Sequence, residues 1–460
     1  MATQPTSSKD ASIIDRLLRL FSDVRAGEGF TALLLMGNLF LLLTSYLIIK
    51  VVREALILGE GGAVVKSYAA AGQALLLLVI VPIYSVVASR VRRIQLINGV
   101  TSFCILVFFL FYLFGRLGFA LGVPFFLWVG IFNLFVVAQF WSFANDLYSE
   151  EQGKRLFPII AFGGGLGAIL GPKMASMLFQ SLGGAGLMLL AGAILFLCII
   201  MANWIHRRVT IGQAAAKAAS LPLNNQGAFQ LVVGQRYFLL IAGLMVILNL
   251  VNTTGEYILG QKVTEEAQRF AAVETVAAPS DGQTTPPKAA AELKAKQYIA
   301  SFYGDFLALV SLLSALAQLF LVSRILKFFG VPASLFFMPL IVFGSYSLVA
   351  IAPVLASIRL AKVLENSTDY SLQNTVRQAL FLPTSREAKY KAKAAIDTFF
   401  VRIGDLLSTG LVFLSVQLSL TSRTLSIINL SLVVLWLLLI TQIGPSYKAL
   451  ATAENPKERQ

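Results

Sequence analysis

"FTALLLMGNLFLLLTSYLIIK", residues 30–50, carries no charged side chain before its final lysine. A helix needs about 20 apolar residues to cross the hydrocarbon core of a membrane, and this stretch provides them. Similar stretches recur along the chain, approximately over 66–88, 94–115, 120–145, 157–181, 185–205, 236–260, 302–323, 331–352, 354–372, 394–418 and 426–444. We therefore expect an all-α integral membrane protein with about twelve transmembrane helices.

The composition agrees with this expectation. Of the 460 residues, 57% are hydrophobic and only 13% are charged, and the mean hydropathy is +0.77. An ordinary soluble domain carries about 25% charged residues, so the composition excludes a soluble enzyme. The formal charge of +14 arises mainly from short segments between the apolar stretches. Lysine and arginine in such segments set the orientation of membrane helices, so we expect the lipid bilayer, and no nucleic acid, as the partner.

The apolar stretches form two sets of six, separated by a polar segment. The basic segments alternate along the chain as a topology with both termini in the cytoplasm requires. The sequence "APSDGQTTPPK", from Ala278, is too rich in proline and threonine to pack a core, and it predicts a mobile extracytoplasmic loop. The expected organisation is a cytoplasmic segment over 1–28 with an amphipathic helix, a first half over 29–208, a cytoplasmic linker over 209–235, a second half over 236–444 with the loop at about 262–296, and a cytoplasmic tail over 445–460.

Two similar segments indicate that the two halves are internal repeats. "SRVRRIQLI" from Ser89 and "SRILKFFGV" from Ser323 follow the second stretch of each half and share their chemistry. Basic residues there could simply bind lipid phosphates. They are also typical of the tight loop between the second and third helices of each half in major-facilitator transporters, whose halves rock about a central site.

Several kinds of chemistry are excluded. Cys104, Cys198 and His206 are the only cysteines and histidine, so neither a disulfide framework nor a Cys/His metal site can be assembled. The run "FGGGLGAILGPK" from Phe162 lacks the lysine and hydroxyl residue that end a phosphate-binding loop. Its Gly163, Gly167 and Gly171 stand four residues apart, a spacing that allows close helix packing. We expect no cofactor, no metal and no ATP-driven pump.

Polar residues inside apolar stretches cost about 2.5–3.5 kcal/mol each and are therefore candidates for a binding site. Lys50 and Glu54 end the first stretch on one helical face and could pair, which would leave Arg53 to bind an anion through its two-pronged guanidinium. Asn145 lies at the end of the fourth stretch and Lys173 lies deep in the fifth.

The second half holds more charge. Glu256 and Asp305 are candidate proton or cation sites, although Asp305 and Tyr303 could be a feature of a helix end. Arg359, Lys362, Glu365 and Asp369 follow one another at three- and four-residue steps and form one charged stripe on the tenth stretch. This stripe is either an internal ladder of ion pairs or the lining of a central cavity. A similar stripe on the eleventh stretch contains Asp397, Arg402 and Asp405.

Two long segments have an unusual pattern, "STDYSLQNTVRQALFLPTSREAKYKAKAAIDTFFVRIGD" from Ser367 to Asp405 and "FWSFANDLYSEEQGKRLFP" from Phe140 to Pro158. Both resemble the ATP:ADP antiporter family of plastids and obligate intracellular bacteria. "YLIIKVVREALIL" from Tyr46 and "RYFLLIAGLMVILNLVNTTGE" from Arg236 are similar to the family's first and seventh helices. The chain departs from the family pattern where lysine is replaced by Arg53, Asp369 and Asp405 and where glutamate is replaced by Gln378. The two acidic replacements remove positive charge from regions where the resemblance implies phosphate contacts.

The resemblance implies a secondary transporter of nucleotides or a related phosphorylated anion, a major-facilitator fold, a bacterial inner membrane, and a monomer. Such a transporter is expected to work by alternating-access exchange, in which positively charged side chains neutralise the substrate. The expected substrate-binding residues are Lys50, Arg53, Glu54, Asn145, Lys173, Glu256, Arg359, Lys362, Asp369, Tyr370 and Arg402. Two alternatives stay open. One is a proton-coupled carrier of a less charged solute, which would explain the lost lysines, and the other is a scaffold that kept the fold without transport. Nothing in the residues predicts an enzyme.

Overall fold

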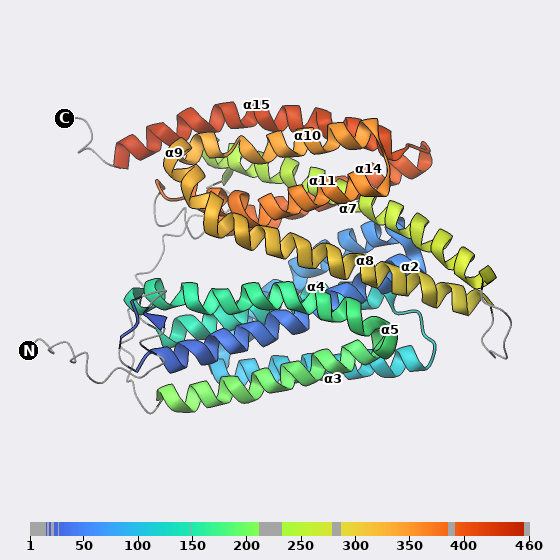
Figure 1. The fold of residues 1–460 in the computed structure, drawn as a ribbon. Helices are drawn as coiled ribbons and strands as arrows, with labels where there is room; N and C mark the ends of the chain where they lie inside the picture. Colours follow the sequence, from blue (N-terminus) through green and yellow to red (C-terminus); the bar gives the residue numbers. More distant parts are fainter. Residues whose placement is uncertain are drawn as a thin grey trace, which may run out of the picture. The chain divides into compact units, whose positions relative to one another are not determined.

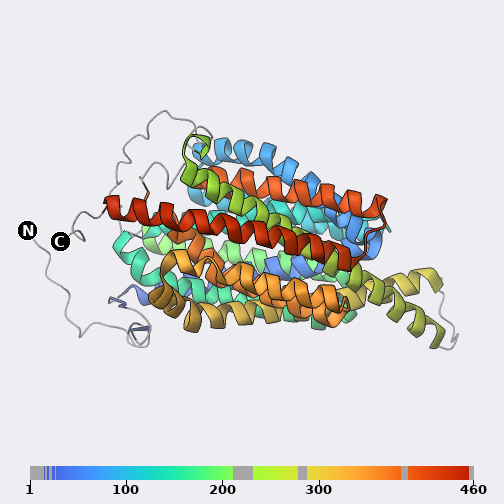
Figure 2. The same ribbon diagram turned by 90° about the horizontal axis from the view of Figure 1, so that it is seen from above.

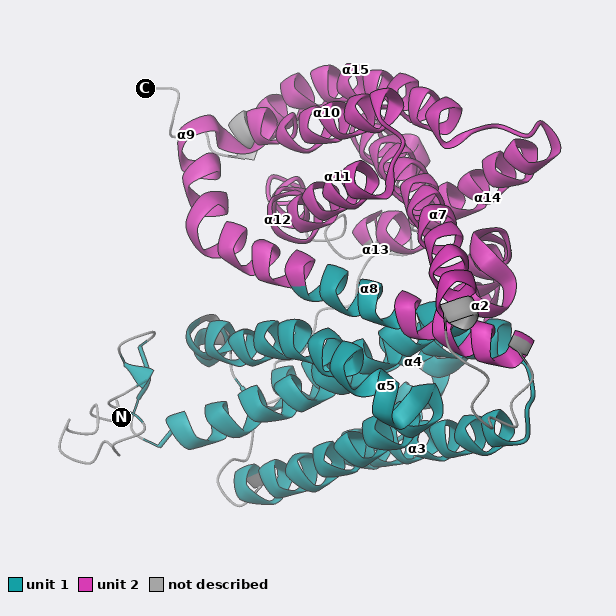
Figure 3. Ribbon diagram, turned by 45° about the vertical axis from the view of Figure 1, so that its right-hand side comes forward, with its two compact units in different colours: residues 1–56, 80–218, 300–308 teal, residues 57–79, 219–299, 309–460 magenta. Residues whose placement is uncertain are grey.

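The computed structural model describes residues 27–148, 150–210, 232–277, 287–384 and 392–454, together with several positions from 15 to 25. Every regular element within these ranges is helical (Figure 1). The chain divides into two compact units, drawn in teal and magenta in Figure 3. Unit 1 comprises residues 1–56, 80–218 and 300–308, and unit 2 comprises residues 57–79, 219–299 and 309–460. The units therefore differ from the two sequence halves, because each half contributes one segment to the other unit.

The helices follow the apolar stretches of the sequence. Their bounds are α2 Gly29–Arg90, α3 Arg93–Arg116, α4 Gly122–Leu147, α5 Glu150–Thr210, α7 Arg236–Ala277, α8 Pro287–Ala317, α9 Ser323–Ser334, α10 Phe337–Ile351, α11 Leu355–Thr368, α12 Asn374–Ala379, α13 Lys393–Ala395, α14 Val401–Gln417 and α15 Ser422–Glu454. Three π-helical segments interrupt the second half, η2 Gln318–Val322, η3 Asp369–Gln373 and η5 Ile396–Phe400.

The number of membrane crossings agrees with the sequence. Eight helices among the described residues are long and apolar enough to cross a membrane. Two of the eight, in α2 and α5, bend sharply at Gly62 and Gly183 and provide two crossings each. Short α10 and the continuous run of α11, η3 and α12 add two more. The described part of the chain thus contains the twelve crossings that the hydropathy pattern predicts.

Glycine is required at both bends. Gly62 has φ 69° and ψ −173°, and Gly183 has φ 65° and ψ 175°. This region of backbone conformation is open to glycine and closed to residues with a Cβ atom. Each glycine therefore turns the chain from one crossing into the next without an intervening loop.

In unit 1, the glycine stripe of α5 packs directly on the first part of α2. A Cβ atom at Gly167 would lie 2.5 Å from the carbonyl oxygen of Phe40, and one at Gly171 would lie 2.8 Å from that of Thr44. A Cβ atom at Gly163 would meet the backbone of Met36. The two helix backbones can approach this closely only because the side chains are missing, which confirms the predicted role of the stripe.

Elsewhere in unit 1, α3 lies beside the second part of α5 (Figure 1). Asn98 and Asn203 exchange two amide hydrogen bonds of 3.0 Å and 2.9 Å between these helices. Cys104 of α3 and Cys198 of α5 are both buried and neither forms a disulfide.

A polar network anchors the start of α2 in unit 1. Glu28 accepts hydrogen bonds from both terminal nitrogens of Arg155, at 2.9 Å and 3.1 Å, and from the Gln152 amide at 3.1 Å. Nearby, the buried carboxylate of Asp15 accepts the backbone N–H groups of Gly27 and Gly29. Burial alone would raise the pKa of Glu28, but the hydrogen bonds from Arg155, the Arg25 backbone and Gln152 lower it below the ordinary 4.5.

This lowered pKa makes the stability of the protein sensitive to acid. Since the folded-state pKa lies below the unfolded one, the contribution of Glu28 is present above about pH 4.5 and is lost as the pH falls through the folded value. Glu28→Gln is expected to cost about 2 kcal/mol at neutral pH and to flatten the loss of stability between about pH 5 and pH 3. Thermal melting of the purified protein across this range measures both effects.

Glu151→Gln is the matched control, because Glu151 forms an exposed ion pair with Arg25 in the same region. Exposed pairs contribute little, so this variant should melt like the wild type. If Glu28→Gln loses stability in acid as steeply as the wild type, groups other than Glu28 dominate the acid-induced loss of stability.

In unit 2, α7 packs against α11, α14 and α15, and α10 packs against α11 and α15. The surface between α7 and α14 is tight, because a Cβ atom at Gly404 would lie 2.8 Å from both Asn249 Cβ and the Val246 carbonyl oxygen. Small polar groups fill the rest of the seam, where Thr254 and Ser408 lie 3.1 Å apart through their hydroxyls. Helix α7 is therefore the element against which the polar residues of unit 2 gather.

The loop predicted over 262–296 is mostly helical. Helix α7 continues to Ala277 and α8 begins at Pro287, and the ends of the two helices extend together at the right of Figure 2. Alanine, glutamate and lysine favour helix here, Ala267 and Ala271 are buried, and Lys294 pairs with Glu274 at 3.0 Å. The prediction was wrong over these residues because it extended the loop expected for the proline- and threonine-rich stretch to the residues on both sides of it. Most of that stretch, 278–286, lies outside the described residues.

The other predicted boundaries differ less from the helix ends in the structure. Helix α15 continues to Glu454, ten residues past the predicted end of the second half, so part of the predicted tail is helical. Residues 211–231 of the linker predicted over 209–235, and most of the amphipathic helix predicted near Ile13, lie outside the described residues.

Candidate functional site

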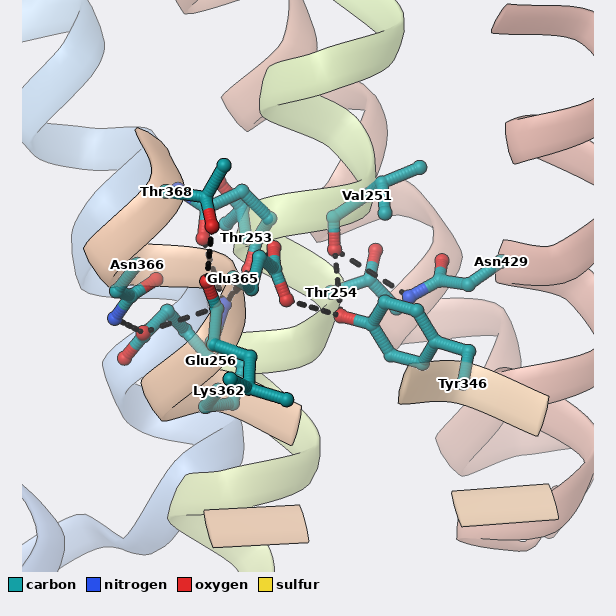
Figure 4. A network of polar contacts seen from close by, with 12 residues as sticks. Val251, Thr253, Thr254, Glu256, Tyr346, Lys362, Glu365, Asn366, Thr368 and Asn429 are labelled. Carbon is teal, nitrogen blue, oxygen red and sulfur yellow. Dashed lines mark hydrogen bonds and ion pairs between the residues drawn. The ribbon is translucent and has the colours of Figure 1, made fainter. Parts of the chain in front are cut away.

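A buried lysine lies at the centre of the polar residues of unit 2. Lys362 of α11 is 1% exposed, and its Nζ donates to Asn252 Oδ1 at 2.7 Å and to the Asn252 carbonyl oxygen at 3.2 Å. It also forms an ion pair of 3.1 Å with Glu365, one turn further along α11 (Figure 4). Removing a charged amine from water is costly unless acceptors bind its hydrogens and an opposite charge lies beside it. For Lys362, Asn252 provides the acceptors and Glu365 provides the charge.

Glu365 is held equally firmly on its other side. Its side chain is also 1% exposed, and Oε2 lies 3.1 Å from the hydroxyl of Tyr346 on α10. The same hydroxyl lies 3.3 Å from the Val251 carbonyl oxygen, which also accepts the side-chain amide of Asn429 at 3.3 Å. A hydrogen bond from Tyr346 of α10 thus holds the Glu365 carboxylate that pairs with Lys362.

Glu256 of α7 is more accessible and joins two cations. Its Oε1 lies 3.5 Å from Lys362 Nζ and accepts a hydrogen bond of 3.2 Å from Asn366. Its Oε2 lies 3.8 Å from Lys66 Nζ, on the part of α2 that belongs to unit 2. The Glu256 side chain is 27% exposed, against 12% for Lys66. We define the Lys362 cluster as Lys66, Asn252, Glu256, Tyr346, Lys362, Glu365 and Asn366.

The backbone of α7 shapes this cluster at Gly255. A Cβ atom there would overlap the Tyr346 hydroxyl and lie 3.1 Å from Lys362 Cδ. Any larger residue would push both side chains away from Glu365. Glycine at this position therefore lets α10 and α11 bring the tyrosine and the lysine against α7.

A second polar group lies where α7 meets α14. Asp405 accepts hydrogen bonds from Asn249 Nδ2 at 2.7 Å and Thr253 Oγ1 at 3.0 Å, and it pairs with Arg402 at 2.9 Å. Asp397, further back on η5, pairs instead with Lys393 at 3.0 Å. The predicted stripe of Asp397, Arg402 and Asp405 therefore consists of separate ion pairs in this structure.

The predicted residues of unit 1 lie in other surroundings. Arg53 Nη2 lies 2.5 Å from Glu54 Oε1, and the guanidinium carbon lies 4.6 Å above the ring centre of Phe126. The sequence analysis did not anticipate this pair, which forms because the flexible arginine side chain reaches its neighbour in sequence. Lys50 lies one turn earlier on α2 and is partly buried.

Two further predicted residues of unit 1 are open to their surroundings. Lys173 pairs with Asp305 at 2.8 Å, and these side chains are 49% and 40% exposed. Asp305 lies well inside α8, so the alternative that it marks a helix end was wrong. Asn145 is exposed near the end of α4.

The stripe on the tenth crossing keeps its predicted spacing. Arg359 and Lys362 lie on α11, and Asp369 and Tyr370 begin the π-helical segment η3. Lys362 and Glu365 form the ion pair that the ladder interpretation expects. Of the six predicted residues that belong to unit 2, the structure brings Glu256 and Lys362 together in the Lys362 cluster.

Several polar residues of the cluster and its surroundings were missed. Tyr346 and Asn429 are polar residues in apolar stretches, and Asn252 belongs to the polar run "NLVNTTGE" from Asn249. Such groups are costly inside a membrane, so their presence was a usable signal. Lys66 begins the second apolar stretch. In the sequence it is indistinguishable from a basic residue that only sets the orientation of a membrane helix.

Sequence comparisons give a consistent assignment. Residues 290–447 match the TLC ATP/ADP transporter family, a range that includes Lys362 and Glu365. ADP,ATP carrier protein 1 of Chlamydia trachomatis is 22% identical over 365 residues, which are 69% of this chain and 63% of the carrier. The matched region therefore spans less than two thirds of that relative's length.

Solved structures agree on the fold. A bacterial homologue of the iron transporter ferroportin, in an inward-facing state, superimposes with a TM-score of 0.63 at 13% identity, over 90% of this chain and 98% of that one. A POT family transporter in complex with 5-aminolevulinic acid gives a TM-score of 0.60 at 14% identity, over 90% and 96% of the two chains. The chain is thus a multi-pass membrane protein with a major-facilitator-type fold that resembles the ATP:ADP antiporters and carries the sequence pattern of the TLC ATP/ADP transporter family over residues 290–447.

Proposed function

We propose that this protein is a secondary active transporter that moves nucleotides, or a related phosphorylated anion, by alternating-access exchange. The observation that carries the proposal is the burial of Lys362, which is 1% exposed on a membrane helix and lies inside the matched family segment. A buried cation on such a helix is retained at a cost and marks a substrate pathway. The relatives' names, ADP,ATP carrier proteins, supply the substrate class.

The residues assign roles within this proposal. Lys66 and Lys362 provide positive charge for a phosphate group, with Glu256 as the accessible carboxylate beside both. Arg359 and Arg402 are further cations of unit 2 for this anion, and Lys50, Arg53 and Lys173 of unit 1 remain predicted substrate-binding residues. The substrate is released chemically unchanged, so the proposal includes no catalytic step. We place the protein in a bacterial inner membrane, as a monomer with both termini in the cytoplasm and with the bilayer as its partner.

A reconstituted transport assay tests the proposal. Proteoliposomes loaded with unlabelled ADP should take up labelled ATP, with saturation and at a rate at least about tenfold above that of protein-free liposomes. Internal nucleotide should stimulate uptake, because exchange returns the carrier in a loaded form. Nucleoside monophosphates, sugar phosphates and inorganic phosphate are tested as competitors to define the anion.

A second candidate is the proton-coupled carrier of a less charged solute. The observation in its favour is the Asp405 group, where a carboxylate with three donors stands at a position that the family resemblance assigns to lysine. If a proton gradient drives uptake of a weakly charged solute while no nucleotide is transported, this candidate replaces the first. If no substrate is transported in either assay, the scaffold alternative holds.

A further inference from the structure

We propose that Glu256 is a built-in substitute for the substrate anion. It neutralises Lys66 and Lys362 while the site is empty, and a phosphate or carboxylate group of the substrate takes its place on binding. The inference rests on the proposed transport function and adds a property to it, namely that the empty carrier can complete its transport cycle. Net transport then accompanies exchange.

The position of Glu256 is that of a bound anion. One carboxylate oxygen faces Lys362 at 3.5 Å and accepts the Asn366 amide at 3.2 Å, and the other faces Lys66 at 3.8 Å. Two lysines and an amide donor are the groups that bind a phosphate or carboxylate oxygen. The three donors come from α2 and α11, whereas Glu256 comes from α7. The site is thus assembled by two helices and occupied by a side chain of a third.

Glu256, rather than Glu365, is the carboxylate that can be displaced. Glu365 is 1% exposed and is fixed by Lys362 and Tyr346, each at 3.1 Å. Glu256 is 27% exposed, and its two ion-pair distances of 3.5 Å and 3.8 Å are longer. Coulomb attraction weakens with distance and with access of water, so the pairs of Glu256 are the ones that an incoming anion can replace.

Glu256 supplies one of the two negative charges that the cluster places beside its two lysines. Lys66 and Lys362 contribute two positive charges, and Glu256 and Glu365 contribute two negative ones. Neutralising the Glu256 carboxylate removes one negative charge from beside both lysines, in a region of low dielectric constant. Closing the site around an unmatched charge is unfavourable, so the carrier would then need an anion from solution for every reorientation.

This difference separates two kinds of transport. A carrier whose empty form cannot reorient is confined to exchange. Its binding site then needs a bound anion both when it turns outward and when it turns back inward. A carrier that neutralises its own cations can return empty and produce net flux. The internal anion therefore predicts measurable net transport in the wild-type protein.

The test compares two fluxes from the same proteoliposomes, preloaded with labelled ADP and with the membrane potential clamped by potassium and valinomycin. Efflux into nucleotide-free buffer measures net transport, and efflux into buffer with unlabelled ADP measures exchange. We expect Glu256→Gln to lower the ratio of net to exchange flux at least about tenfold, a factor that corresponds to 1.4 kcal/mol. Glu256→Asp, which keeps the charge, should keep most of the ratio.

Two further variants make the result specific. Glu256→Gln combined with Lys66→Gln removes one charge of each sign and should restore the ratio towards the wild-type value. Glu265→Gln is the matched control on the same helix, because Glu265 pairs with Lys262 at 2.6 Å outside the cluster. Its flux ratio should equal that of the wild type. All variants are first shown to be monodisperse and to melt cooperatively.

The possible failures are distinguishable. A Glu256→Gln protein that is folded and keeps the wild-type ratio, or that loses both fluxes together, overturns the inference while leaving nucleotide transport established. A wild-type protein that moves no nucleotide in either mode overturns the proposed function itself.

Discussion

Replacing Lys362 by methionine is expected to reduce nucleotide exchange by at least about a hundredfold. The lysine donates to Asn252 and pairs with Glu365 and Glu256, and methionine has similar length but no charge or donor. Loss of a charge-assisted contact to the substrate amounts to about 3 kcal/mol, which is about a hundredfold in binding. The measurement is the concentration dependence of labelled nucleotide uptake in proteoliposomes.

The same substitution is expected to lower stability, since Glu365 would remain buried without its cation. Breaking a buried ion pair by removing one partner costs about 3–5 kcal/mol. Combining Lys362→Met with Glu365→Gln should recover much of the melting temperature but none of the transport. Lys327→Met, at an exposed lysine of α9, is the control and should leave both unchanged. Exchange that persists in the stable double variant would show that Lys362 has only a structural role.

Replacing Gly167 by leucine is expected to prevent the first helix of α2 from packing on α5. The new Cβ atom alone would lie 2.5 Å from the Phe40 carbonyl oxygen and 3.1 Å from Thr44 Oγ1. Backbone atoms cannot move aside without separating the two helices, so the cost exceeds the 1–3 kcal/mol usual for overpacking, at about 3 kcal/mol or more. The expected result is a low yield of monodisperse protein and a lower melting temperature in detergent.

Gly165→Leu supplies the matched comparison. Gly165 lies on the same helix, and a Cβ atom there has nothing within 4 Å. Both substitutions raise the intrinsic helix propensity by the same amount, so the difference between them isolates the packing effect. Equal melting temperatures for the two leucine variants would show that the α2–α5 contact contributes little to stability.

Much of the fold follows from local sequence. Most membrane crossings are long, apolar and nearly free of charge, so hydropathy locates them, and the four-residue spacing of Gly163, Gly167 and Gly171 identifies a packing face. The hairpin of α7 and α8 was missed because helix propensity and ion pairs such as Lys294–Glu274 outweigh the polar composition of its flanks. The π-helical segments have no sequence signal, since one extra residue per turn depends on packing against neighbouring helices.

The site was predictable in part. Charge inside an apolar stretch identifies Glu256 and Lys362, because burial of an ion is expensive wherever it occurs. Pairing is a different problem, since it depends on which helices become neighbours. Lys66 lies about 190 residues before Glu256 in sequence, and its role emerges only when α2 meets α7 in unit 2. Arg53 shows the same limitation at short range, because its choice of Glu54 depends on a side-chain rotamer that spacing does not determine.

The burial of Cys104 and Cys198 has a practical consequence for site-specific labelling. Thiol reagents reach an accessible thiolate and react slowly with a buried thiol, so the natural sequence already serves as an almost unreactive background. A single cysteine introduced at Val273, which is 71% exposed on the α7 hairpin, would therefore carry nearly all of the label. A membrane-impermeant maleimide added to intact cells then reports directly on which side of the membrane this hairpin lies.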